Sequence, residues 1–356
     1  MKQNGILRAR PTYLLVIALL TAAVLLSLAA AVTLGSVDIS IGEVYRVILF
    51  KTFGLGDPAV YGAGAVSDIV WFVRLPRLVL AVGVGMCLSL AGVVMQAIVR
   101  NPLADPYVLG VSSGASLGAS LAILTGVGTG LLGANAPGVL AFIGAFAVSV
   151  AVVALANLGG RANAVKLLLA GTALSSVCAA FSNFLLYLSA SANAAQTLMR
   201  WTMGSLAGAE WPTNIPILVI SLLGLLFFWS QFRTLNLMLL GDDTALTLGV
   251  DLHRRRLAYL LVASLLVGCA VYTAGIIGFV GLVIPHIVRI LFGSDHKKIV
   301  PISALLGAIF LLWADVLCRV LIPGAELPIG VLTAMIGAPC FIWLMVRRKY
   351  GFGGGD

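Results

Sequence analysis

The sequence predicts an all-α, polytopic membrane protein with about ten transmembrane helices, organised as a single domain over residues 1–356. Three observations predict this fold class. First, 61% of the residues are hydrophobic and only 10% are charged, whereas about 25% of the residues of a typical soluble domain are charged. Second, apolar stretches of membrane-spanning length follow one another along the chain. Third, basic residues are distributed unequally among the polar segments between these stretches.

Polar residues delimit the predicted crossings, and glycine and proline divide the stretches that are too long for one helix. The first crossing has about 20 residues, which is too long for the core of a cleaved signal peptide, so we expect it to be retained. In chain order, the predicted crossings are 13–34, 78–99, two helices from 107–160 that meet at a turn over 135–138, 166–189, 214–231, a full and a shorter helix from 257–287 that meet near 275–281, 299–320 and 327–346.

An even number of crossings places both chain ends on the same side of the membrane, and the basic residues test this independently of hydropathy. One side collects Lys2, Arg8, Arg10, Arg100, Arg161, Lys166, Arg233, Arg254, Arg255, Arg256, Lys297, Lys298, Arg347, Arg348 and Lys349. The other side keeps Arg46, Lys51, Arg74, Arg77, Arg200 and Arg319, and Arg289 lies near a helix end. We therefore expect a multi-pass protein of the bacterial cytoplasmic (inner) membrane with both termini in the cytoplasm. The net charge of +9 reflects this topology, not a nucleic-acid partner.

The segment 100–115 interrupts two apolar stretches with a dense run of polar and helix-breaking residues. Broken backbone at membrane depth is tolerated only where it is buried in protein or lines a water-filled path. A pathway through the membrane is therefore the first functional hypothesis. Within this segment Asp105 either caps the helix that starts at Pro106 or braces the turn, and we expect the cap.

The segment 36–68 mixes apolar and polar residues and is expected on the outer face. Such a pattern is typical of an amphipathic helix that lies on the bilayer surface. A docking surface for an external partner is the alternative.

The segment 241–250 lies in the longest cytoplasmic connection and has the signals of a short, capped helix. Either Asp242 or Asp243 can cap its N-terminus. Gly249 can supply the left-handed residue that ends it.

Three apolar residues of this short helix, Ala245, Leu246 and Leu248, are then expected to project into the cytoplasm. Exposed apolar side chains favour a helix that inserts into a groove on another protein. A solvated loop whose short helix rests on the bundle is an equal alternative.

The chain lacks the residue patterns of catalysis. It contains no Gly-Lys-Ser or Gly-Lys-Thr, hence no phosphate-binding P-loop, so ATP must bind elsewhere. Its histidines and cysteines show no metal-ligand spacing; they are His253, His286, His296, Cys87, Cys178, Cys269, Cys318 and Cys340. We therefore predict a chain that is not an enzyme and that has no catalytic residue, metal site or cofactor of its own.

Four segments carry a resemblance to a known family: Arg-Leu-Pro-Arg at 74–77, and the motif-rich stretches 89–115, 275–286 and 326–339. With these segments the chain resembles the permease subunits of type II ABC importers, the FecCD-type permeases that take up iron-siderophore complexes, haem or vitamin B12. The similarity extends from residue 74 to residue 346. It implies the type II ABC importer permease fold, ten transmembrane helices, and a homodimer that encloses a translocation path at its interface.

The resemblance also implies partners and the residues that meet them. Two ATPase subunits, which carry ATP and Mg²⁺, would bind coupling helices within 240–254, through Asp242, Asp243, Ala245, Leu246, Leu248 and Gly249. A substrate-binding protein on the outer face would offer acidic residues to Arg74, Arg77 and Arg319, since arginine stays charged and offers forked donors to a carboxylate. The cytoplasmic gate would consist of Asn101, Leu103, Ala164 and Val165.

Two of these assignments have alternatives. Snorkelling at the membrane interface would explain Arg74 and Arg77 equally well. At Ala164 and Val165 the family's vitamin B12 permease has small hydroxyl residues, and the apolar pair in this chain is instead compatible with a hydrophobic constriction that excludes water.

An iron chelate, either an iron-siderophore complex or haem, is the expected substrate, and vitamin B12 or another cobamide is the alternative. A different class of function, a proton-coupled secondary transporter, would use Asp315 as the proton carrier, because this acid comes closest to lying within a span. Asp315 and Arg319 share a helix face near a helix end, and no chain of acidic residues continues inward from them. These two features favour the importer.

Overall fold

The computed structural model describes residues 10–35, 37–158, 162–189 and 191–347. Within these ranges every regular element is a helix, which confirms the all-α prediction. Predictions that concern Lys2, Arg8, Arg161, Arg348 and Lys349 lie outside the described residues.

The longer helices coincide with the predicted crossings. They are α1 (Arg10–Thr33), α5 (Leu75–Val99), α6 (Val111–Thr125), α8 (Ala136–Asn157), α9 (Ala164–Leu188), α11 (Trp211–Ser230), α14 (Leu252–Ala274), α15 (Val280–Phe292), α16 (His296–Val320) and α17 (Ile329–Arg347). In the described part of the chain, seven helical segments are long and apolar enough to cross a membrane, and α6, α15 and α17 contribute shorter apolar helices. A total of about ten crossings therefore stays a prediction.

Shorter helices connect these elements. They are α2 (Ile41–Phe53), α3 (Pro58–Tyr61), α4 (Ala65–Asp68), the π-helix η2 (Ile69–Arg74), the 3₁₀ helix η3 (Pro106–Leu109), α7 (Thr129–Leu132), the 3₁₀ helix η4 (Gly133–Asn135), α10 (Ala192–Thr202), α12 (Phe232–Leu240) and α13 (Asp242–Thr247). The predicted amphipathic segment contains α2, which begins with a capping box between Ser40 and Glu43.

The predicted turn over 135–138 is wrong in position. The chain between α6 and α8 turns over 126–135, where Gly126 and Gly128 adopt positive φ angles of 75° and 81°. Residues 136–138 already belong to α8, with Pro137 in its first turn. Proline is tolerated there because the first turn of a helix needs no backbone N–H donor.

Helix α5 lies at the centre of the bundle, and almost all of its residues are buried. It packs against α11, α14, α15 and α16. Glycines permit this close approach: a Cβ added to Gly92 would lie 1.8 Å from the carbonyl oxygen of Gly281 in α15, and one added to Gly85 would lie 2.3 Å from that of Gly307 in α16. Small residues at helix contacts are typical of membrane proteins.

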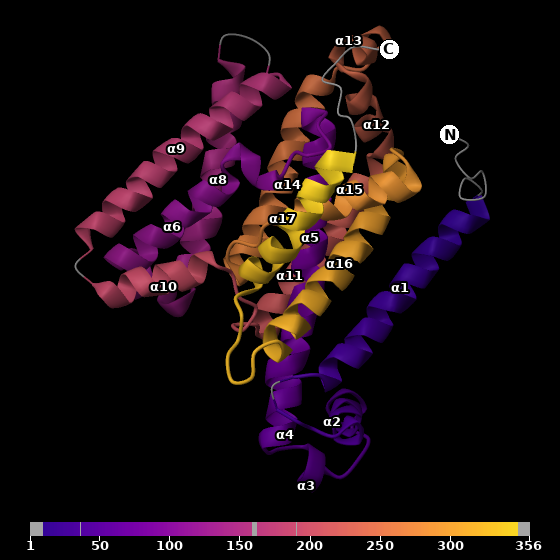
Figure 1. Cartoon of the computed structure of the whole chain (residues 1–356), viewed down its shortest axis with the longest axis vertical. Helices are drawn as coiled ribbons and strands as arrows, with labels where there is room; N and C mark the ends of the chain where they lie inside the picture. The colour runs from indigo at the N-terminus through magenta and orange to yellow at the C-terminus, as the bar shows by residue number, and fades with distance from the viewer. Residues whose placement is uncertain (1–9, 36, 159–161, 190, 348–356) are drawn as a thin grey trace.

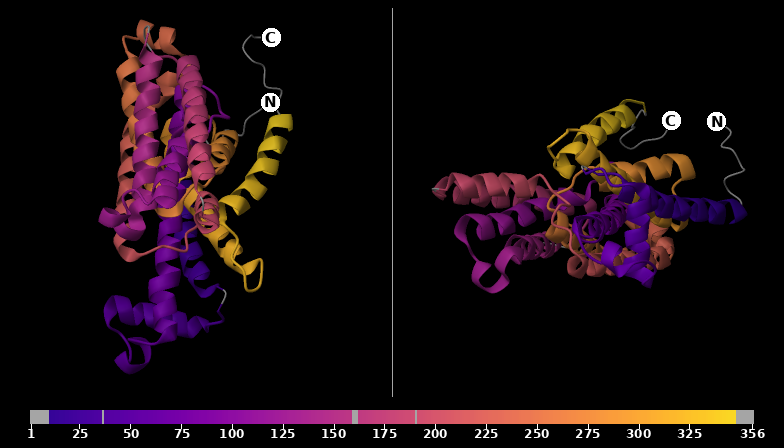
Figure 2. Two further views of the ribbon diagram at one scale, coloured as in Figure 1. Left: turned by 90° about the vertical axis from the view of Figure 1, so that its left-hand side faces the viewer. Right: turned by 90° about the horizontal axis from the view of Figure 1, so that it is seen from below.

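The two ends of the bundle carry different elements (Figure 1). Helices α2, α3 and α4 lie at one end, and α12 and α13 lie at the other, together with the first turn of α1 and the last turn of α17. In the left-hand view of Figure 2, α17 slants away from the neighbouring helices. The helices α6, α8 and α9 form a side group that reaches the centre through α14.

Most of the interrupted segment after α5 packs against protein, whereas Arg100 and Asn101 at its start are exposed. Arg100 ends α5 in the left-handed conformation, with φ 56°. Asp105 caps η3 by accepting a hydrogen bond from the backbone N–H of Tyr107 at 2.8 Å, which confirms the predicted cap. A Cβ added to Gly281, at the start of α15, would lie 2.7 Å from Pro106. The break after α5 therefore packs directly against the break before α15.

We expect Gly92→Ala to destabilise the protein, because its new Cβ cannot fit against the backbone of α15. Overpacking of this kind typically costs about 1–3 kcal/mol. Thermal unfolding of the purified protein in detergent measures the effect. Gly42→Ala on α2 is the matched control, since nothing lies within 4 Å of a Cβ at that exposed position. Equal melting temperatures for the two variants would contradict the close contact between α5 and α15.

Candidate functional site

Three buried or nearly buried arginines meet at the end of the bundle that carries α2. Arg74 and Arg77 lie at the junction of η2 and α5, and Arg319 lies in the last turn of α16. Together with Glu326 they line a cavity of about 340 Å³, which we call the arginine pocket; its other lining residues are Gly35, Val37, Ile69, Val73, Gly324 and Ala325. The fold thus brings together the three arginines that the sequence analysis assigned to docking.

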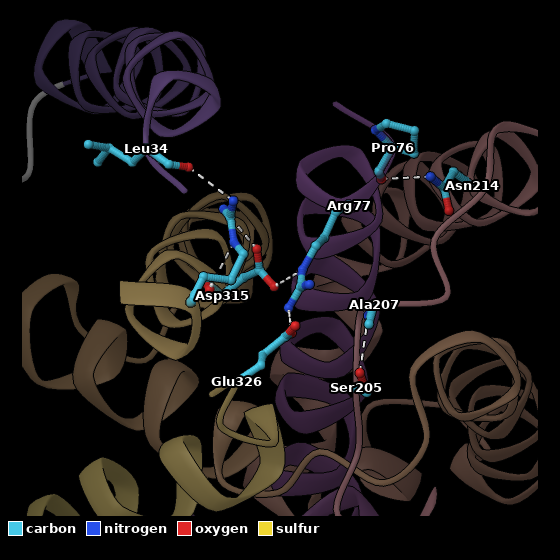
Figure 3. A network of polar contacts seen from close by, with 9 residues as sticks. Leu34, Pro76, Arg77, Ser205, Ala207, Asn214, Asp315 and Glu326 are labelled. Carbon is cyan, nitrogen blue, oxygen red and sulfur yellow. Dashed lines mark hydrogen bonds and ion pairs between the residues drawn. The ribbon is translucent and has the colours of Figure 1, made fainter. Parts of the chain in front are cut away.

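Asp315, fully buried on α16, joins two of these arginines (Figure 3). Its Oδ1 atom lies 2.6 Å from Nε of Arg77, and its Oδ2 atom lies 3.1 Å from Nη2 of Arg319. The predicted pairing of Asp315 with Arg319 is confirmed. Arg77 also donates to a carboxylate oxygen of Glu326. Glu326 differs from Asp315 in that 41% of its side chain is exposed.

Arg74 has no carboxylate partner among these contacts and instead ties α1 to α5. Its guanidinium donates to the carbonyl oxygens of Val32, at 3.0 Å, and of Thr33, at 3.1 Å, and also to that of Val37. The snorkelling alternative is wrong for Arg74 and Arg77, because both side chains are buried within the protein and do not face the bilayer surface.

The three guanidinium groups have three carboxylates near them. Asp315 and Glu326 pair with Arg77 and Arg319, and Asp38 interacts electrostatically with Arg74. The forked guanidinium groups that line the pocket are suited to binding a carboxylate. Docking of a partner protein at Arg74, Arg77 and Arg319 stays a prediction.

Helix α13, at the opposite end, is capped differently from the prediction. Its N-cap is Gly241, and no side chain caps its first turn, so the prediction that Asp242 or Asp243 caps it is wrong. The Asp242 carboxylate instead pairs with the guanidinium of Arg256 on α14. The predicted C-terminal signal is confirmed: Gly249 has φ 76°.

This C-terminus forms a Schellman motif. The Gly249 N–H donates to Leu246 and the Val250 N–H donates to Ala245, both at 2.9 Å. The short helix therefore has a fixed end, which makes α13 a defined structural unit.

The apolar residues of α13 divide between two faces. Leu246 and Leu248 are 50% and 60% exposed, as predicted. Ala245 is fully buried, so the prediction that it projects into the cytoplasm is wrong. Its small side chain lets α13 rest on the bundle while the two leucines face outward. Both sequence-based alternatives, a helix resting on the bundle and a helix presenting an apolar surface, therefore describe part of α13.

The predicted gate residues occupy two separate segments. The exposed Asn101 follows α5, and its side chain accepts a hydrogen bond from the Leu103 N–H at 2.9 Å. Ala164 and Val165 begin α9, and Val165 is 64% exposed. In the described part of the chain no hydrogen bond joins one pair to the other, so their role as a gate stays a prediction.

Glu326 and Arg256 are site residues that the sequence did not identify. Glu326 begins one of the four family-like segments, but its partner Arg77 lies 249 residues earlier in the chain. In the sequence, Arg256 is one of three successive arginines that indicate topology. Only the structure separates them, because Arg254 and Arg255 are exposed and Arg256 is buried.

The described residues contain no group of three or more His, Cys, Asp or Glu side chains that could hold a metal ion. The expectation that the chain binds no metal or cofactor stays a prediction.

Comparisons with known proteins agree with this architecture. A family model described as the FecCD transport family matches residues 15–347. The chain is 43% identical to the hemin transport system permease protein HmuU of Yersinia pestis over 80% of this chain and 86% of that protein. It is 42% identical to the vitamin B12 import system permease protein BtuC of Salmonella typhi over 78% and 83% of the two chains. It is 40% identical to the ABC transporter permease protein YvrB of Bacillus subtilis over 91% of each.

A solved structure has the same fold. It is described as an inward-facing conformation of a metal-chelate type ABC transporter, and it superimposes with a TM-score of 0.79 at 31% sequence identity over 93% of this chain and 99% of that chain. The similarity therefore includes nearly all the described helices.

We expect Asp315→Ala to destabilise the protein strongly, because two nearly buried guanidinium groups would lose their shared carboxylate. Removing one partner of a buried ion pair costs about 3–5 kcal/mol. Glu326→Ala is the matched control, because its carboxylate is partly solvated and its loss should cost less than about 1 kcal/mol. Thermal unfolding in detergent measures both variants. A similar melting temperature for the two would show that Asp315 does not organise the cluster.

Proposed function

Because this chain belongs to the FecCD transport family, we propose that it is the permease subunit of an ATP-driven importer that moves a large iron chelate, either an iron-siderophore complex or haem, into the cytoplasm. The chain is an ABC importer permease and a multi-pass membrane protein, and the proposal proceeds from this class. The observation that carries the proposal is the presence of one potential docking site at each end of the bundle. The arginine pocket lies at one end, and the exposed leucines of α13 lie at the other.

The α13 end faces the cytoplasm in this proposal, and each of two ATPase subunits receives one copy of α13. Leu246 and Leu248 are the apolar contacts that enter a groove on the ATPase. The rigid Schellman end supports this role, because a helix that transmits force must keep its shape. ATP and Mg²⁺ bind to the ATPase, and this chain performs no catalysis.

The arginine pocket faces outward and receives acidic residues of a substrate-binding protein. The forked guanidinium groups that line the pocket support this role, as does the position of the pocket at the opposite end from α13. Both chain termini then lie in the cytoplasm, and the membrane is the bacterial cytoplasmic membrane.

The translocation path lies between two copies of the chain. An apolar cavity of about 580 Å³ supports this placement; Thr202, Met203, Ile276, Gly278, Phe279, Gly330, Val331, Ala334 and Met335 line it. It contains no charged side chain, which suits a path that must release a bulky chelate. Asn101, Leu103, Ala164 and Val165 close this path on the cytoplasmic side.

The substrate class rests on relatives. The similar proteins include a hemin permease, a vitamin B12 permease and a metal-chelate transporter. Import of vitamin B12 is the second candidate, since the identities of 43% and 42% to the hemin and vitamin B12 permeases are nearly equal. The proton-coupled alternative has less support, because arginine nitrogens lie close to both oxygens of Asp315, the acid that it would use.

Transport should require the ATPase. We expect the chain, reconstituted in liposomes with its ATPase subunit and substrate-binding protein, to accumulate an iron chelate only when ATP is supplied. The measurement is uptake of iron-siderophore, haem and cobalamin in parallel. Accumulation driven by a proton gradient without the ATPase would refute the importer. If the binding protein retained only cobalamin, cobalamin and not an iron chelate would be the substrate.

The exposed leucines of α13 should be needed for ATPase binding. We expect Leu246→Asp and Leu248→Asp together to abolish co-purification with the ATPase, because charges would enter an apolar groove. The control is Leu55→Asp, which changes an equally exposed leucine at the opposite end of the bundle. Normal ATPase binding by the double variant would show that α13 is not the coupling helix.

A further inference from the structure

Arg256 is a buried arginine that contacts two segments remote from each other in the sequence. It lies in the second turn of α14. Its Nη1 atom lies 3.2 Å from Oδ2 of Asp242, and its Nη2 atom donates to the other oxygen of that carboxylate. The same Nη1 atom donates to the carbonyl oxygen of Ala162 at 3.2 Å. One guanidinium therefore joins the first residue of α13 to the segment that leads into α9.

The geometry of these contacts fixes relative positions. Two parallel hydrogen bonds between a guanidinium and a carboxylate define an orientation as well as a distance. The Arg256 side chain is buried, whereas 41% of the Asp242 side chain is exposed, so the pair is shielded from solvent on the arginine side. A lysine would keep the charge but not the fork.

The segment that receives Arg256 is held firmly to the start of α9. Ala162 is itself buried. The next residue, Asn163, is the N-cap of α9 and accepts a hydrogen bond from the Lys166 N–H at 2.9 Å. Ala164 and Val165, two predicted gate residues, lie within this capped turn. A displacement of Ala162 therefore displaces both residues with it.

The other predicted gate segment also touches the start of α13. A Cβ added to Gly241 would lie 2.7 Å from Nη1 of Arg100. Arg100 ends α5 and directly precedes Asn101, another gate residue. The N-terminus of α13 thus contacts one gate segment through Arg100 and the other through Arg256.

Helix α12, which directly precedes α13, is also anchored to the bundle. Asn236 on α12 donates to Asp295 at 2.9 Å and accepts from the backbone N–H of His296 at 2.9 Å, which ties α12 to the start of α16. Arg256 and Asn236 hold α12 and α13 at two points. Motion of α13 imposed from outside is therefore passed on to the helices that these residues contact.

We infer that Arg256 is the positioning residue that transmits movement of α13 to the start of α9, and so couples ATP hydrolysis to opening of the cytoplasmic gate. This inference rests on the proposed function. It assigns to Arg256 no contact with the ATPase, the chelate or the binding protein, so its loss should affect coupling and leave ATPase binding intact.

The test uses the full complex with ATPase and binding protein in liposomes. For Arg256→Gln we expect the ATPase to remain bound and to hydrolyse ATP, while the amount of chelate transported per ATP falls by about fivefold or more, the usual lower range for coupling between sites. Arg256→Lys should show a similar loss, because it lacks the fork. The matched control is Arg233→Gln, which removes an exposed arginine on α12, outside the segment 240–254, and should keep the wild-type ratio.

A second variant removes the same ion pair by changing its exposed member, Asp242. It is informative even if the change at the buried Arg256 prevents folding. Asp242→Asn should lower the transport-to-ATP ratio, and the double variant Asp242→Asn with Arg256→Gln should be no worse than the more impaired single variant, because both remove one interaction. A wild-type ratio in Arg256→Gln would overturn the inference, and so would losses that multiply in the double variant. If Arg256→Gln does not assemble, a wild-type ratio in Asp242→Asn overturns it instead. Failure of the importer proposal is distinguishable, since the wild-type complex would then show no ATP-driven transport.

Discussion

Close packing around α5 is the constraint on which the other features of this structure depend. In a bilayer, apolar helices gain little from leaving lipid, so they associate through tight van der Waals contact. Here that contact requires glycine: Gly92 and Gly85 bring the backbones of α15 and α16 almost to touching distance from α5. Because α5 is fixed on all sides, its two ends are fixed as well. One end places Arg77 in the arginine pocket, and the other places Arg100 against α13.

Both ends of the bundle contain an ion pair between a buried arginine and a partly exposed carboxylate. Arg77 pairs with Glu326 at one end and Arg256 with Asp242 at the other, and Arg77 is held in addition by the buried Asp315. A fully buried ion pair would be difficult for a partner to influence, whereas an exposed carboxylate would be strongly solvated and weakly held. A half-exposed carboxylate combines internal order with access from outside. Such an arrangement suits surfaces that must respond to another protein.

Two breaks in the helices, one after α5 and one before α15, lie next to each other in the structure. They pack on each other through Pro106 and Gly281, so protein and not lipid covers the chain where they meet. Phe279, which precedes α15, adopts a positive φ of 68°. A non-glycine residue in this conformation is uncommon, and such strain is typical of functional sites. It also lines the apolar cavity assigned to the path.

The sequence by itself determined the fold class, the positions of the long helices, the cap at Asp105 and the left-handed residue Gly249, because hydropathy and capping depend on residues close together in the chain. Its motifs also identified the family. Only the tertiary structure decided which face of α13 is buried, and that Asp242 pairs with Arg256 instead of capping its own helix. It also decided that Arg77 is shared by Asp315 and Glu326. These choices depend on which helices become neighbours in space. Arg77 lies 238 and 249 residues from its two partners, and Arg256, although only 14 residues from Asp242, lies on a different helix, so a local pattern records neither pairing.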